Sequence, residues 1–255
     1  MCYDDNARPP VPETAHGSAH GEDIVLTASD GNRFAAYAAT PDQPLGAQVI
    51  IYPDVRGLHQ FYKELALRFA ESGVQAVAID YFGRTAGLTS RDDSFEYMPH
   101  VQKLQTSTFF SDVQAAVDFL HSSAQGTLPT FTVGFCMGGT FSFLSATQNF
   151  SLAGVVGFYA GMSRNVGGEG TVLDRASEIK YPVLGLFGGA DQGIPVEQVH
   201  EFEKRLKSTG VENTIVIYPD APHSFFDRRA TDHAEASADA WHRVFHFIED
   251  HKSNA

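Results

Sequence analysis

The sequence predicts an α/β fold in which a mostly parallel sheet is covered by helices on both faces. Short continuous apolar runs, typical of strands buried on both sides, alternate with segments whose apolar residues recur at helical spacing. This alternation predicts βαβ units and therefore parallel strands. The chain shows neither an internal repeat nor an interdomain linker. We therefore expect one domain with about seven or eight strands.

The bulk composition fits one large domain. The chain has 255 residues, of which 43% are hydrophobic and 12% aromatic, so a sizeable core can form. Its formal net charge of −13 repels phosphate backbones and anionic lipid surfaces, so we expect no nucleic-acid or membrane partner. No apolar run is long enough to span a bilayer, and the start of the chain lacks an apolar signal segment.

The two cysteines, Cys2 and Cys136, are too few for a disulfide framework. An unpaired Cys136 in a glycine-rich turn fits a reducing compartment, so we expect a cytoplasmic protein. The sequence leaves open whether it is a monomer or a homodimer.

The first elements are a leader and a hairpin. Residues 1–21 are rich in Pro, Gly, Ala and His, and they predict a leader that lies on the surface or is partly disordered, ahead of a domain over 22–255. Apolar runs at 23–29 and 33–40 flank Asp30-Gly31-Asn32. Asp-Gly between apolar runs predicts an antiparallel hairpin.

The remaining elements alternate between strand and helix. The expected strands lie in "AQVIIYPD", "VQAVAIDYFG", "TFTVGF", "LAGVVGFYAG", "YPVLGLFGGAD" and "NTIVIYPDAPHSF". The expected helices lie in "YKELALRFAESG", "STFFSDVQAAVDFLHSS", "MGGTFSFLSATQ", "PVEQVHEFEKRLKSTG" and "ADAWHRVFHFIEDH". Residues 84–105 show little periodicity and are expected to cross the surface.

The turn Gly134-Phe135-Cys136-Met137-Gly138 joins an apolar strand to a helix. A sharp strand-to-helix turn strains its central residue and requires small residues two positions before and after it. Such a turn exposes the central side chain at the edge of the sheet, and the dipole of the following helix favours a thiolate. Cys136 is therefore a candidate nucleophile. The alternative is a small buried side chain, which is the commonest role of free cysteine.

A candidate acid and base follow in the order that an α/β-hydrolase requires. Asp191 ends one later strand in "LFGGADQGIP", and His223 ends the next in "YPDAPHSF". Taken alone, Asp191 could be a turn residue or a helix cap, and His223 an ordinary loop histidine. Their joint occurrence after Cys136, each at a strand end, favours a catalytic set.

These motifs resemble those of the dienelactone hydrolase family, a branch of the α/β-hydrolases with a cysteine nucleophile. The resemblance rests on "VIIYPDVRGLH", "AIDYFGR", "VGFCMGG", "LFGGADQGIPV" and "APHSFF", and it runs from about residue 22 to residue 249. It implies a Cys136–His223–Asp191 triad and an oxyanion hole formed by the N–H groups of Met137 and Val55.

The resemblance also implies candidates around the nucleophile. Family members place a carboxylate beside the cysteine, and Asp54 occupies that position with a side chain one methylene shorter than the usual glutamate. Two arginines hold the substrate carboxylate in the best-known members. Arg228 lies one position from the first, and Arg91 and Tyr97 are candidates for the second.

Further pocket candidates are less specific. Arg84 could bind substrate or form a surface ion pair. Aromatic residues expected near the mouth could line a pocket for a planar organic acid or pack as ordinary core: Tyr81, Phe82, Tyr97, Phe225 and Phe226. We expect no metal, because His242 and His246 lack the glutamate of H-E-x-x-H. We expect no cofactor, because no G-x-G-x-x-G is present.

The favoured function is hydrolysis of a lactone or small carboxylic ester through a thioester acyl-enzyme, as in carboxymethylenebutenolidase. A small-molecule ester or lactone is then the partner. Two alternatives remain open from the sequence. One is a broader carboxylesterase or thioesterase of the same fold. The other is a non-catalytic protein that binds a partner or senses oxidants through Cys136, although a sensor is expected to carry a resolving cysteine close by.

Overall fold

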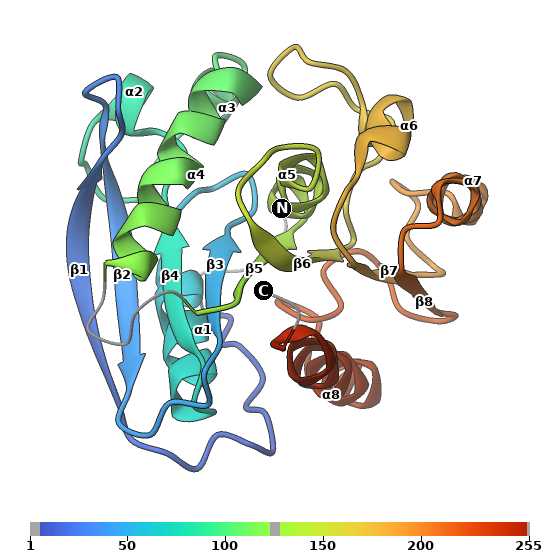
Figure 1. The fold of residues 1–255 in the computed structure, drawn as a ribbon, viewed down its shortest axis with the longest axis horizontal. Coiled ribbons are helices and arrows are strands. Elements are labelled where there is room, and N and C mark those ends of the chain that lie inside the picture. Colours follow the sequence, from blue (N-terminus) through green and yellow to red (C-terminus); the bar gives the residue numbers. More distant parts are fainter. Residues whose placement is uncertain (1–5, 123–127, 254–255) are drawn as a thin grey trace.

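A single sheet forms the centre of the molecule (Figure 1). The computed structural model describes residues 6–122 and 128–253, and within these ranges eight strands form a sheet of order β1-β2-β4-β3-β5-β6-β7-β8. The strands are β1 (Ala19–Thr27), β2 (Arg33–Pro41), β3 (Gln48–Tyr52), β4 (Gln75–Ile79), β5 (Thr130–Phe135), β6 (Leu152–Phe158), β7 (Val183–Gly188) and β8 (Asn213–Tyr218). The predicted α/β class is confirmed.

The direction of the strands follows the predicted pattern. β1 and β2 form the antiparallel hairpin around Gly31, whose φ of 85° suits glycine. β2 also pairs antiparallel with β4, and every later pair is parallel. β1 begins at Ala19, so the strand extends into the leader predicted for residues 1–21. Cys2 and residues 3–5 of that leader lie outside the described residues.

Helices cover both faces of the sheet, as expected. Figure 1 shows α1 and α8 on one face and α4, α5 and α7 on the other. The helices are α1 (Gln60–Glu71), α2 (Gly83–Ala86), α3 (Met98–Val101), α4 (Thr106–His121), α5 (Met137–Ser145), α6 (Val172–Arg175), the 3₁₀ helix η1 (Ala176–Glu178), α7 (Val196–Thr209) and α8 (Ala234–His251). In the described part of the chain, no helix combines the length and apolarity needed to cross a bilayer.

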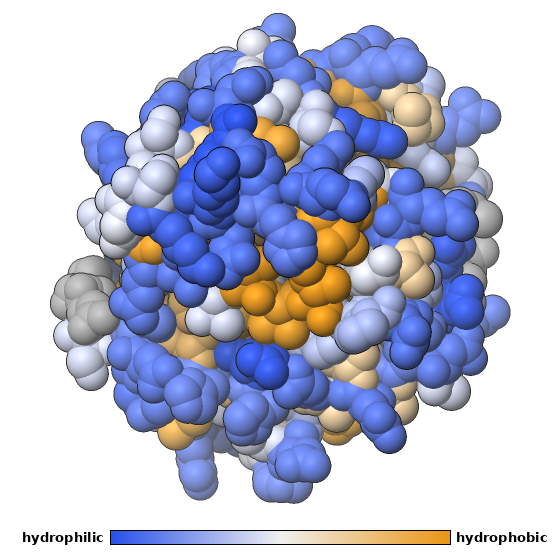
Figure 2. Space-filling model, turned by 90° about the vertical axis from the view of Figure 1, so that its right-hand side faces the viewer, coloured by the Kyte–Doolittle hydropathy of each residue, from blue (hydrophilic) through white to orange (hydrophobic). Residues whose placement is uncertain are grey.

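The central strands are completely buried, which explains their continuous apolar runs. β3, β4, β5, β6 and β7 contain only buried residues. β8 is an edge strand whose Ile215, Val216 and Ile217 are partly exposed. Figure 2 looks onto this side of the molecule, where an apolar patch lies at the centre of a mostly hydrophilic surface. The weaker periodicity of residues 84–105 corresponds to loops that carry the short helices α2 and α3.

Candidate active site

The backbone at Cys136 has the shape expected of a nucleophile elbow. β5 ends at Phe135, α5 begins at Met137, and Cys136 between them has φ 56° and ψ −115°. A positive φ in a residue other than glycine stores strain, which persists only where surrounding contacts enforce it. The Cys136 N–H donates to the carbonyl oxygen of Phe158 at 3.0 Å and holds this conformation.

The two glycines of the motif are required by close backbone contacts. A Cβ on Gly134 would lie 2.0 Å from the carbonyl oxygen of Gly138. A Cβ on Gly138 would lie 2.1 Å from the carbonyl oxygen of Tyr52 and 2.3 Å from that of Pro53. The turn therefore passes the end of β3 and the start of α5 at distances that only glycine allows, as the motif predicts.

Asp191 and His223 meet at the ends of two adjacent strands. His223 Nδ1 lies 2.6 Å from Asp191 Oδ2. The other carboxylate oxygen accepts the N–H of Gly193 at 2.8 Å, which fixes the orientation of Asp191. The Asp191 side chain is 2% exposed and that of His223 is 30% exposed. A buried carboxylate on Nδ1 leaves Nε2 of the imidazole for a reacting group.

One pocket of about 620 Å³ collects the predicted catalytic residues. Cys136, Asp191 and His223 line it together with Val55 and Met137, the two expected oxyanion donors. Cys136 is partly exposed and forms no disulfide. The loops that carry these residues follow β3, β5, β7 and β8, whose carboxyl ends meet at one edge of the parallel sheet.

Asp54 lies beside this pocket and is completely buried. Its Oδ1 accepts the N–H of Arg56 at 2.8 Å. Burial opposes ionisation and raises the pKa of Asp54 to about 6. The Arg56 N–H and charge, followed by the Tyr62 hydroxyl, act in the opposite direction but more weakly.

The wall of the pocket combines an apolar side with an arginine-rich rim. Tyr97 and Arg228, both candidates from the sequence, line the pocket. Arg164 and Arg229 also line the pocket, and no sequence motif singled them out. Arg229 pairs with Asp232 at 2.9 Å, whereas no carboxylate in the described ranges pairs with Arg164 or Arg228. The apolar side is formed by Met98, Val101, Val166 and Ile194.

Two predicted arginine contacts to substrate are wrong. Arg84 pairs with Asp30 at 2.5 Å and with Asp112 at 2.8 Å, so the alternative interpretation of an ion pair holds. Arg91 forms a buried pair with Asp80 at 2.9 Å. Neither side chain lines the pocket that contains Cys136. Each pair joins two separate segments of the chain, so it follows from the fold and not from the local pattern.

The aromatic candidates, Tyr97 apart, belong to the core. Phe225 is fully buried and packs against Tyr159 and Tyr218, so its predicted contact with substrate is wrong. Tyr81, Phe82 and Phe226 are at most 2% exposed and do not line the pocket either. The alternative of core packing therefore holds for these aromatic side chains.

Tyr159 is a pocket residue that the sequence analysis missed. It follows β6, has a φ of 36°, and places its ring centroid 4.9 Å from that of His223. Its hydroxyl donates to Asp227 Oδ2 at 2.8 Å. Burial raises the pKa of Asp227 well above its usual range. The positive φ was the useful signal here, and it is visible only in the structure.

No described residues form a metal site. Across residues 6–122 and 128–253, no three His, Cys, Asp or Glu side chains are grouped so that they could hold an ion. His242 and His246 lie on the exposed side of α8, where His246 pairs with Asp250 at 2.7 Å.

The strained cysteine elbow, followed along the chain by an acid and a base at later strand ends, defines an α/β-hydrolase. The model of the dienelactone hydrolase family matches residues 34–252. The chain therefore belongs to the dienelactone hydrolase family, as its motifs predicted, and it is a hydrolase of the ester and lactone class.

Known proteins similar to this chain agree with that assignment. A Yersinia pestis protein named "Putative carboxymethylenebutenolidase" is 29% identical over 250 residues, which cover 94% of this chain and 91% of the relative. A crystal structure of a "Putative Dienelactone Hydrolase" from Klebsiella pneumoniae has a TM-score of 0.80 at 24% identity, covering 91% of this chain and 99% of the other. A dienelactone hydrolase-like promiscuous phosphotriesterase, P91, from metagenomic libraries has a TM-score of 0.72 at 21% identity, covering 92% and 99%. These structural likenesses concern the fold.

Proposed function

We propose that this enzyme hydrolyses small carboxylic esters or lactones, in the manner of a carboxymethylenebutenolidase, through a thioester formed on Cys136. The observation that carries the proposal is the convergence of Cys136, His223 and Asp191 on one pocket, with Asp191 2.6 Å from His223 Nδ1. The names of the similar proteins, which refer to lactone hydrolysis, support the same substrate class.

Acylation begins with proton transfer. His223 takes the thiol proton of Cys136 through Nε2, because Nδ1 is engaged with Asp191. The thiolate attacks the carbonyl carbon, and the N–H groups of Met137 and Val55 stabilise the oxyanion that develops on the carbonyl oxygen. The tetrahedral intermediate collapses, the C–O bond breaks, and the alkoxide or enolate leaving group receives the proton from His223.

Deacylation uses the same groups. His223 removes a proton from water, the hydroxide attacks the thioester carbonyl, and the C–S bond breaks as His223 returns the proton to the sulfur. The products are a carboxylic acid and the free thiol of Cys136. A lactone keeps its leaving group tethered to the acyl group, so water must react before the ring closes again. Enol esters and enol lactones suit this mechanism because their leaving groups depart readily.

The rim of the pocket favours an anionic substrate. Arg164 and Arg228 line the pocket, and no described carboxylate pairs with either guanidinium. Guanidinium groups bind carboxylates through two parallel hydrogen bonds. On a chain with a formal net charge of −13, such a rim gives a local attraction that the remaining surface lacks. A lactone that carries a carboxylate is therefore the first substrate to test.

The test follows the loss of ultraviolet absorbance of a dienelactone that bears a free carboxylate. We expect turnover by the wild type, slower turnover of the corresponding methyl ester, and a fall in kcat of about 10⁴-fold or more in Cys136→Ala. Chemical denaturation verifies that the variant is folded. If folded wild-type protein does not hydrolyse the lactone but cleaves simple esters or thioesters, the result would favour the alternative function of a broader esterase or thioesterase. Turnover that survives in Cys136→Ala would contradict the cysteine mechanism.

A further inference from the structure

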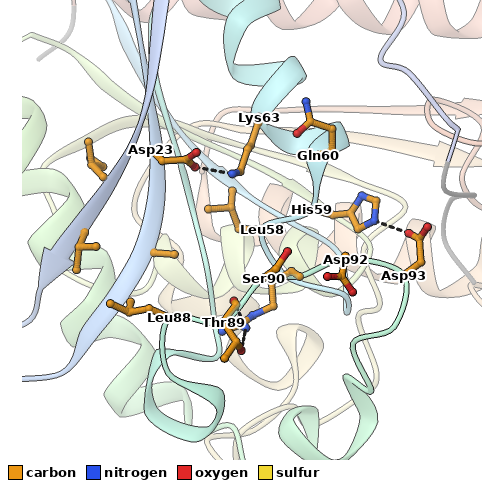
Figure 3. Close-up of a pocket in the computed structure, with 14 residues that line it drawn as sticks. Asp23, Leu58, His59, Gln60, Lys63, Leu88, Thr89, Ser90, Asp92 and Asp93 are labelled. Carbon is orange, nitrogen blue, oxygen red and sulfur yellow. Dashed lines mark hydrogen bonds and ion pairs between the residues drawn. The ribbon is translucent and has the colours of Figure 1, made fainter.

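Two segments that border the active site are connected to each other by ion pairs and hydrogen bonds. The first is the loop 54–59, which follows β3 and contains Val55. The second is the wall segment, residues 87–101, which ends in α3 and supplies Tyr97, Met98 and Val101 to the pocket. Their junction opens on a second pocket of about 630 Å³, on which Leu58, His59 and residues 88–93 lie together (Figure 3).

The deeper connection is a buried ion pair. Asp80 lies directly after β4 and is completely buried. Its carboxylate accepts hydrogen bonds from Arg91 of the wall segment, from Nη2 at 2.9 Å and from Nε at 3.2 Å. The same carboxylate accepts the N–H of Leu58 at 3.1 Å. Asp80 therefore holds both segments. Removing a partner of a buried pair leaves an uncompensated charge, so this connection serves the fold as a whole.

The outer connection is made by Asp93 of the wall segment. Its Oδ1 lies 3.0 Å from His59 Nε2 and 3.3 Å from Arg56 Nη2. The His59 and Arg56 side chains are only 6% and 7% exposed, whereas the Asp93 carboxylate is 53% exposed. Figure 3 shows His59 and Asp93 facing one another across the junction. One exposed carboxylate thus holds two buried side chains of the loop 54–59.

These contacts hold the two residues on either side of Val55. The residue before it, Asp54, accepts the N–H of Arg56 through its carboxylate, and the residue after it is Arg56. Arg56 is therefore fixed at its backbone by Asp54 and at its guanidinium by Asp93. A peptide N–H that stabilises an oxyanion must point at the position of that oxygen, and a misplacement of 1 Å can cost about 10²-fold in rate.

We infer that Asp93 is a positioning residue for the reaction. Through Arg56 and His59 it orients the Val55 N–H toward the oxyanion, and it connects this donor to the wall segment that carries Tyr97. The inference rests on the proposed function. Because an oxyanion exists only in the transition state and the tetrahedral intermediates, loss of Asp93 lowers kcat rather than weakening ground-state binding.

The decisive variant is Asp93→Asn, measured on the ester or lactone that the wild type cleaves best. We expect kcat to fall about 10-fold to 100-fold while KM changes less than about 3-fold. Asp93→Glu retains the charge and is expected to recover part of the lost kcat. Because the Asp93 carboxylate is half exposed, both variants are expected to fold.

Asp92→Asn is the matched control. Asp92 is the exposed neighbour of Asp93 on the same pocket, and its Oδ1 accepts hydrogen bonds from Ser94 N–H at 3.0 Å and Ser94 Oγ at 2.6 Å within its own segment. We expect its kcat to stay within about 2-fold of wild type, as is usual for a surface substitution away from the machinery.

Two probes separate positioning from a general disturbance. A trifluoromethyl ketone analogue forms a tetrahedral adduct with an oxyanion, so its affinity should fall in parallel with kcat/KM in Asp93→Asn. Thiol–disulfide exchange of Cys136 with 4,4′-dithiodipyridine passes through no oxyanion, so its rate should not change.

Three outcomes would overturn the inference while leaving the proposed function standing. They are a wild-type kcat in Asp93→Asn, an equal loss in Asp92→Asn, and a loss of dithiodipyridine reactivity that accounts for the loss of turnover. A wild type without ester or lactone turnover, or full turnover in Cys136→Ala, would overturn the proposed function and this inference with it.

Discussion

Asp54 shows how burial sets the protonation of a single side chain beside the proposed nucleophile. The carboxyl has no exposed surface, and burial raises its pKa to about 6. Near neutral pH a substantial fraction of the Asp54 carboxyl groups is therefore ionised although the side chain is buried. The sequence placed a carboxylate at this position, but its depth of burial depends on contacts that only the folded chain provides.

The raised pKa of Asp54 predicts a pH-dependent cost of folding. The folded protein holds the proton up to about pH 6, whereas the unfolded chain releases it near pH 4. The contribution of Asp54 to stability is therefore fully present below about pH 4, and it is lost as the pH rises through 6. Asp54→Asn lacks this titration, so from pH 4 to pH 8 it should gain stability relative to wild type by about 3 kcal/mol at most. Urea denaturation at both pH values measures the difference.

The comparison within one pair of proteins removes the contribution of titrating groups that do not interact with Asp54. Asp227 is not among them, because the charge of Asp54 adds to the rise in the pKa of Asp227. Burial also raises the pKa of Asp112 to about 6, but Asp112 is present in both proteins and its contribution cancels. Parallel pH profiles for wild type and Asp54→Asn would show that folding does not raise the pKa of Asp54, and they would contradict the prediction.

At the level of elements, the turn between β5 and α5 depends on backbone contact more than on the cysteine. Gly138→Ala would place a methyl group 2.1 Å and 2.3 Å from the carbonyl oxygens of Tyr52 and Pro53. Backbone atoms of a buried central strand cannot move aside cheaply, so we expect a loss of about 3 kcal/mol or more in the free energy of unfolding. Thermal and urea denaturation of the variant measure it.

Gly161→Ala is the matched control for this turn. Its added Cβ would meet no atom closer than Thr140 Oγ1 at 3.6 Å, which is an ordinary contact, and Gly161 has no positive φ. We expect a change within about 1 kcal/mol. A Gly138→Ala protein as stable as Gly161→Ala would show that the elbow tolerates a side chain after the nucleophile.

The elements also show which part of the site the sequence could predict. Cys136, Asp191 and His223 each follow a strand with a clear apolar pattern, so chain order and sheet topology were sufficient to bring them to one edge. Arg164 and Tyr159 follow β6 in a loop without periodicity, and nothing local marks them as pocket residues. For Arg84 and Arg91 the sequence was misleading, because their ion pairs with Asp112 and Asp80 depend on how separate segments fold together.

On the scale of the whole molecule, the beginning and the end of the described chain pack against each other. The indole Nε1 of Trp241 in α8 donates to the carbonyl oxygen of Pro10 at 2.8 Å, across 231 positions of sequence. Pro9 and Pro12 are buried, and a groove of about 830 Å³ runs between residues 8–14 and α8. This segment thus covers a helix on one face of the sheet, and none of residues 6–18 lines the catalytic pocket.

Removal of residues 1–12 should therefore lower stability without changing the chemistry. Trp241 is 3% exposed and is the only tryptophan of the chain, so tryptophan fluorescence reports on the surroundings of this one side chain. Loss of the Pro10 carbonyl and of two buried prolines should cost about 2 kcal/mol and shift the Trp241 emission to longer wavelength. kcat and KM should stay within about 2-fold of wild type, because the residues of the proposed triad and both proposed oxyanion donors remain anchored by the sheet. Val11→Ser, at a side chain that is 64% exposed, should leave the emission and the unfolding midpoint unchanged. A truncated chain with wild-type emission would contradict the packing of this segment on α8, and one that has lost activity at full stability would mean that the segment acts on the active site.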